Sequence, residues 1–109
     1  MSQQLASVRS RLEKLLHLLE SGRHPGRARV EDTLTDGYAW ALKLDAECGR
    51  LERSIGTLAA ELNLDSSEQQ ARELSRTARR LARSKRDLAA LRGLLAALRD
   101  VVGGRYPGE

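Results

Sequence analysis

Apolar residues recur at alternating steps of three and four in three separate stretches of the chain, and this spacing constrains the fold more than any other feature. It places every member on one stripe of an α-helix, and its repetition is typical of coiled-coil packing. The first stripe consists of Leu5, Val8, Leu12, Leu15 and Leu19. The second consists of Leu34, Gly37, Ala41, Leu44, Cys48, Leu51, Ile55, Leu58 and Leu62. The third consists of Leu74, Thr77, Leu81, Ser84, Leu88, Leu91, Leu95, Leu98 and Val102. The chain is therefore predicted to form three helices that bury these stripes against one another or against a partner.

Residues that favour turns and helix caps separate the stripes and set the predicted helix ends. Gly22 stops the first helix, and the segment after it is basic and contains proline, which cannot continue a helix. Thr33 with Asp36 has the spacing of a capping box at the start of the second helix. Either Asp65 or Ser66 caps the third helix, and a Gly-Gly pair ends it. The predicted segments are helix one at 2–21, a connector at 22–32, helix two at 33–63, helix three at 66–102 and a tail at 103–109.

The turn between the second and third stripes is too short for anything but an antiparallel hairpin. Folding the chain at this turn places Asp45 opposite Lys85 and Glu47 opposite Arg80, so acids on one helix meet bases on the other. From Leu88 onward the apolar face of the third helix widens, and the first helix is its natural cover. The 109 residues are thus predicted to form a single all-α domain, a three-helix antiparallel bundle with a long coiled-coil hairpin made by helices two and three.

The stripes also predict the core. Thr77 and Ser84 interrupt the third stripe with hydroxyl groups, which we expect to bond back to their own helix. Seven positions are predicted to be core: Leu44, Leu51, Ile55, Leu81, Leu88, Leu91 and Leu95.

Nothing in the residue pattern indicates catalysis. Cys48 is the only cysteine, lies on a stripe and has no histidine or aspartate placed to activate it. The two histidines lack the spacing of a metal site, and no phosphate-binding loop is present. We therefore expect no enzymatic activity, no catalytic residues, no metal and no cofactor.

The chain shows neither a secretory signal nor an apolar run of the roughly 18 residues that a membrane span needs. A cytoplasmic protein without membrane association is predicted, and the preference for arginine over lysine indicates a GC-rich bacterial genome.

Five arginines form the one surface feature that rises above this background. They follow one another at steps of 4, 3, 4 and 3 on the face of the third helix opposite its apolar stripe. We call them the arginine row: Arg72, Arg76, Arg79, Arg83 and Arg86. Residues 68–87 contain seven bases and three acids, a net charge of +4 that equals the formal net charge of the whole chain. The row is either a solvated face or the binding site of an anionic partner.

Among the functional interpretations, an acidic protein surface is favoured as the partner. The chain would then be a small bacterial regulator or adaptor. A nucleic acid or a phosphorylated ligand such as a nucleotide is the first alternative, although no aromatic residues lie near the row for base stacking. Self-association, with a homodimer as its simplest form, is the second. Gly49 and Gly56, seven residues apart on one side of helix two, mark a possible surface for close contact with another helix.

Overall fold

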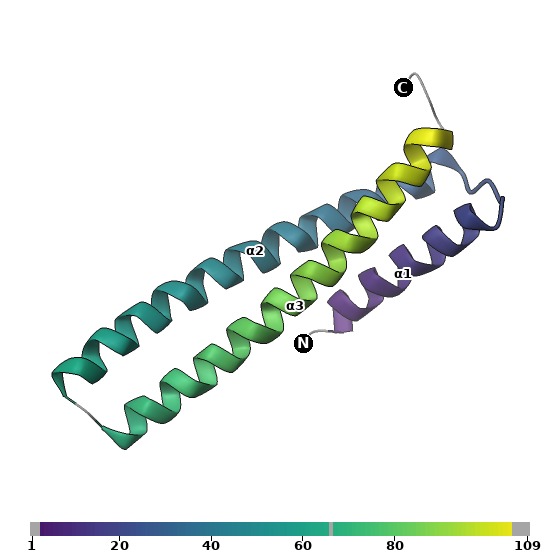
Figure 1. Cartoon of the computed structure of the whole chain (residues 1–109). Helices are drawn as coiled ribbons and strands as arrows, with labels where there is room; N and C mark the ends of the chain where they lie inside the picture. The colour runs from purple at the N-terminus through teal and green to yellow at the C-terminus, as the bar shows by residue number, and fades with distance from the viewer. Residues whose placement is uncertain (1–2, 66, 106–109) are drawn as a thin grey trace. The chain divides into compact units, whose positions relative to one another are not determined.

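Three helices make up the computed structural model, which describes residues 3–65 and 67–105 (Figure 1). The helices are α1 (Gln3–Glu20), α2 (Arg27–Leu64) and α3 (Glu68–Arg105), and no strand occurs within the described ranges. The predicted all-α fold, a helical bundle in which helices two and three form a hairpin, is confirmed.

The chain divides into two compact units, to both of which α2 and α3 contribute. The first unit comprises Met1–Leu42 and Ala89–Glu109, and so contains α1, the beginning of α2 and the end of α3. The second unit, Lys43–Leu88, contains the remainder of α2 and the beginning of α3.

The first unit is a three-helix bundle with a leucine core. All five stripe residues of α1 are buried, and Leu91, Leu95 and Leu98 of α3 are buried with them. The neighbouring helices pack tightly on Gly37 of α2, where a Cβ atom would lie 2.8 Å from Leu95 Cδ2 and 3.2 Å from both Cδ atoms of Leu12. The absence of a side chain at Gly37 therefore allows leucines from both neighbouring helices to meet over α2.

The second unit is a two-helix hairpin, and its core is thinner. Leu44, Leu51 and Leu88 are buried as predicted. Ile55 and Leu81 are only half-buried, so their assignment to the core was wrong. Because this unit contributes two helices to the contact, the edges of each stripe stay open to solvent where a third helix would close them.

The end of α1 is fixed by Gly22, as predicted. Gly22 has a φ of 82°, a left-handed conformation that glycine adopts without steric cost. The amide of Arg23 donates to the carbonyl of Leu18 at 3.0 Å, and the amide of Gly22 donates to that of Leu19 at 3.2 Å. These two bonds form a Schellman motif, which satisfies carbonyl groups that the helix end would leave without partners.

Helix α2 begins at Arg27, six residues before the start that the capping box predicted. The carbonyl of Gly26 accepts the first helical hydrogen bond, from the amide of Val30 at 3.2 Å. Thr33 does not act as a cap, because its hydroxyl donates to the carbonyl of Arg29 at 2.8 Å within the helix. Buried Val30 lies seven residues before Gly37, so the second stripe continues further toward the N-terminus and the helix continues with it.

Helix α3 is capped by Ser67, not by Asp65. The hydroxyl oxygen of Ser67 accepts a hydrogen bond from the amide of Gln70 at 3.0 Å, and the carbonyl of Ser67 accepts one from the amide of Ala71 at 3.0 Å. The alternative cap, Ser66, lies outside the described residues. Helix α3 continues through the Gly-Gly pair to Arg105, because glycine lowers helix propensity without removing a backbone hydrogen bond.

Candidate functional site: an arginine row on the hairpin

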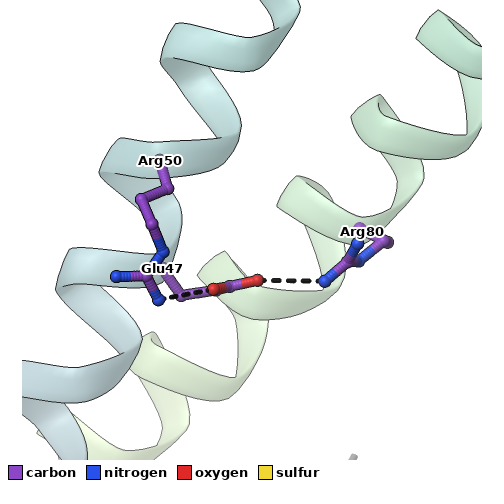
Figure 2. Close-up of polar contacts among 3 residues, drawn as sticks. All are labelled: Glu47, Arg50 and Arg80. Carbon is purple, nitrogen blue, oxygen red and sulfur yellow. Dashed lines mark hydrogen bonds and ion pairs between the residues drawn. The ribbon is translucent and has the colours of Figure 1, made fainter.

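An ion pair between α2 and α3 shows the register of the hairpin that carries the arginine row. Glu47 Oε1 accepts a hydrogen bond from Arg80 Nη2 at 3.1 Å, and its Oε2 accepts one from Arg50 Nη2 at 2.7 Å (Figure 2). The predicted pairing of Glu47 with Arg80 is confirmed, and with it the antiparallel arrangement. Asp45 and Lys85 both act electrostatically on the thiol of Cys48, and their predicted pairing with each other stays a prediction.

Helical periodicity then places the row on the outer face of α3. Thr77 is buried against α2, and its hydroxyl donates to the carbonyl of Glu73 at 2.9 Å, as expected for a hydroxyl on the stripe. The arginines of the row lie on the opposite side of the helix, and all five are exposed. From Arg72 to Arg86 the row extends about 21 Å at the standard helical rise.

One arginine of the row has a carboxylate partner on its own helix. Arg76 Nη2 donates to Glu73 Oε2 at 2.8 Å, and both side chains are more than half exposed. The other four arginines form no ion pair with any residue of the described ranges. Like charges three and four residues apart oppose helix formation by a few tenths of a kcal/mol per pair. Repulsion among the arginines of the row therefore lowers the stability of α3 slightly, and within the described residues only the Arg76–Glu73 pair offsets this repulsion.

The chemistry available at the row is the binding of anions. A guanidinium group offers paired N–H donors that match a carboxylate or a phosphate in bidentate geometry. Residues 43–88, which make up the second unit, contain no Phe, Tyr or Trp. The row thus offers charge and hydrogen bonds along a line, without a side chain on which a nucleobase could stack.

The second predicted surface, at Gly49 and Gly56, is open. A Cβ atom at Gly49 would meet only Arg53 Nη1, at 3.5 Å, and one at Gly56 would meet nothing within 4 Å among the described residues. An added Cβ at either glycine would therefore meet no atom of α3 within 4 Å among the described residues. A partner at these two glycines remains a prediction.

Cys48 lies in an environment that suppresses thiol chemistry. Burial raises the pKa of the Cys48 thiol, and the carboxylates of Glu52, Asp45 and Glu47 raise it further, against the opposing effect of Lys85. The thiol therefore stays protonated at neutral pH, which is the opposite of what a nucleophile needs.

Other kinds of site have little support in the structure. Residues 3–65 and 67–105 contain no group of three or more His, Cys, Asp or Glu side chains that could hold a metal ion. None of the helices, in the part that the structure describes, has the length and apolar character needed to cross a membrane. The chain matches no protein-family model, and comparisons with curated proteins and with solved structures find no match either.

Proposed function

We propose that the chain is a non-enzymatic interaction module that binds an acidic protein surface through the arginine row. The observation that carries the proposal is the exposure of five guanidinium groups on one face of a helix whose opposite face is packed. Four of the five lack a carboxylate partner within the described residues, so an incoming carboxylate would displace only water.

The spacing of the row favours a protein partner over a nucleic acid. Steps of three and four residues match the spacing of carboxylates on one face of a second helix, which could lie alongside α3. The lack of aromatic residues in the second unit removes the stacking that single-stranded nucleic acids use. A small bacterial regulator or adaptor is the role that fits such a surface best. The lone buried thiol of Cys48 suits a reducing cytoplasm, where we place the protein.

The test compares the parent with the double variant Arg76→Glu, Arg83→Glu. Both positions are exposed, so the fold should survive, and circular dichroism checks this. The probe is a helical peptide with glutamates at steps of 4, 3, 4 and 3, and its affinity for the double variant should fall by roughly 100-fold, since two charge-assisted contacts are replaced by repulsion. Lys14→Glu with Arg29→Glu is the matched control, because it makes the same change in charge in the first unit and should leave the affinity nearly unchanged.

Single-stranded RNA and duplex DNA are the competing probes. Preferential binding of either, with an affinity that falls steeply as salt rises, would contradict the proposal in favour of phosphate recognition. Sedimentation equilibrium of the chain alone tests the other alternative, which is self-association. Dimerisation that the double variant abolishes would mean that a second copy occupies the row.

A further inference from the structure

The first unit has a groove on the side of α2 and α3 that faces away from α1. Its volume is about 350 Å³, and its described lining residues belong to α2 and α3. Asp36 of α2 forms an ion pair with Arg11 of α1 at 2.8 Å, and Tyr38 lies about 200° further around α2 at the standard helical periodicity. The groove at Tyr38 is therefore opposite to the side that α1 covers. It is lined by Tyr38, Ala41, Arg92, Leu95, Ala96 and Arg99.

The floor of the groove is apolar and shallow. Leu95 is 3% exposed at its base, and the small side chains of Ala41 and Ala96 are half-buried beside it. Tyr38, which is 42% exposed, forms part of the wall on α2, and Leu42, 72% exposed, follows one helical turn later on the same helix. Leu42 is not among the lining residues, but with Tyr38 it adds exposed apolar surface beside the groove. Small residues on the floor of a groove let another helix approach closely.

The edge of the groove on α3 is basic. Arg92 and Arg99 are both exposed and are separated by seven residues, or two helical turns, so they project on the same side of α3. A helix lying in the groove would pass both guanidinium groups with positions of its own that are also seven residues apart. Carboxylates at those positions would form bidentate pairs. In a symmetric contact with a second copy of the chain, the arginines of both copies would instead meet in one interface, and like charges oppose that arrangement.

We infer that this groove binds an amphipathic helix of another protein, with its apolar stripe over Leu95 and Ala96 and with acidic residues spaced seven apart facing Arg92 and Arg99. The inference is independent of the arginine row, which belongs to the other unit of the chain. Bound in this way, the partner helix would complete a four-helix arrangement around the first unit.

The experiment is a selection from a displayed library of amphipathic helices whose positions flanking the apolar stripe are randomised. Selection on the parent chain should enrich Glu and Asp at flanking positions seven residues apart. The affinity of the best peptide should fall by at least about tenfold for Arg92→Glu, Arg99→Glu and also for Ala96→Gln, which fills the groove without changing its charge. The row variant Arg76→Glu, Arg83→Glu should bind it as the parent does. Circular dichroism melting establishes that each variant is folded, and the single variant Arg99→Glu replaces the double variant if the latter is not.

Three results would overturn the inference. One is a selection that enriches neutral or basic flanks. Another is a set of peptides whose affinity depends on Arg76 and Arg83 but not on Arg92 and Arg99; such peptides would support the arginine row as the only binding surface. The third is a dimer of the chain alone that Ala96→Gln disrupts, which would mean that a second copy fills the groove.

Discussion

At the scale of single residues, Gly37 shows how a missing side chain determines packing. An added Cβ would meet Leu95 and Leu12 at distances of 2.8 and 3.2 Å, so at least one of these two buried side chains would have to shift. Overpacking of this kind costs about 1–3 kcal/mol, whereas replacing glycine by alanine in a helix gains about 1 kcal/mol. Gly37→Ala should therefore lower the free energy of unfolding by up to about 2 kcal/mol, measured by denaturant titration.

Gly56 provides the matched control, because a Cβ there meets nothing within 4 Å among the described residues. Gly56→Ala should raise the free energy of unfolding by up to about 1 kcal/mol through helix propensity alone. If both variants were stabilised equally, the close approach at Gly37 would not exist.

Cys48 supplies a prediction about pH. Because burial and neighbouring carboxylates raise its pKa, a smaller fraction of the thiol is ionised at any given pH than for a free cysteine. The rate of alkylation should therefore begin to rise at a higher pH in the folded protein than in the same protein unfolded in denaturant. The folded state also holds this proton more tightly than the unfolded chain. This difference contributes to the free energy of unfolding in full below the thiol pKa of the unfolded chain, and the contribution is lost as the pH rises through the thiol pKa of the folded protein.

The alkylation rates provide the test. If the folded and the unfolded protein showed the same dependence of alkylation rate on pH, the raised pKa of Cys48 would be contradicted.

At the scale of helices, substitution of the N-cap residue Ser67 tests how α3 begins. Ser67 accepts the amide hydrogen of Gln70, a donor that the start of the helix would leave without a partner. Ser67→Ala should lower the free energy of unfolding by about 0.5–2 kcal/mol. Ser54→Ala, at an exposed position inside α2, is the control and should leave stability unchanged or slightly higher. Thermal melting compares the two, and equal melting temperatures would exclude Ser67 as the cap.

The sequence predicted which side of each helix is buried more reliably than it predicted where each helix begins and ends. The stripes predicted three helices because period and direction are encoded in the spacing of apolar residues. The start of α2 was missed because one apolar residue, Val30, extends the stripe through a basic segment that resembles a loop. Thr33 could form a capping box or bond back to its own helix, and the sequence does not distinguish between these two hydrogen bonds.

At the scale of the whole molecule, the two candidate surfaces differ in how far the sequence could reveal them. The arginine row lies on one helix, so its exposure follows from its phase relative to the stripe. The groove was missed because Tyr38 and Arg99 come from different helices. Whether they line a groove depends on which side α1 covers, and no linear pattern specifies that. Burial depth was missed for a related reason: a stripe gives the direction of Leu81 but not the number of helices that surround it.

The distribution of charge over the chain yields the last prediction. Residues 68–87 carry +4, and the whole chain carries the same formal net charge, so the remainder is balanced. Repulsion within this segment should make the protein less stable at low salt, where charges are screened least. Arg76→Glu with Arg83→Glu converts the like-charge neighbours at three and four residues along the row into attractive pairs. The same change replaces the Arg76–Glu73 ion pair and the neighbouring charges at 83 and 87 by repulsion, but more pairs become attractive than become repulsive. The double variant should therefore melt at a higher temperature than the parent at low ionic strength.

The parent and the double variant Arg76→Glu, Arg83→Glu should also differ in how their melting temperatures depend on salt concentration. Added salt screens the repulsion in the parent and the new attractions in the double variant, so the difference between their melting temperatures should narrow as salt rises. A difference that stays constant from low to high salt would show that the arginines do not repel one another measurably. The row would then impose no electrostatic cost on the free chain, and a partner could gain only through direct contacts with the guanidinium groups, without relief of repulsion.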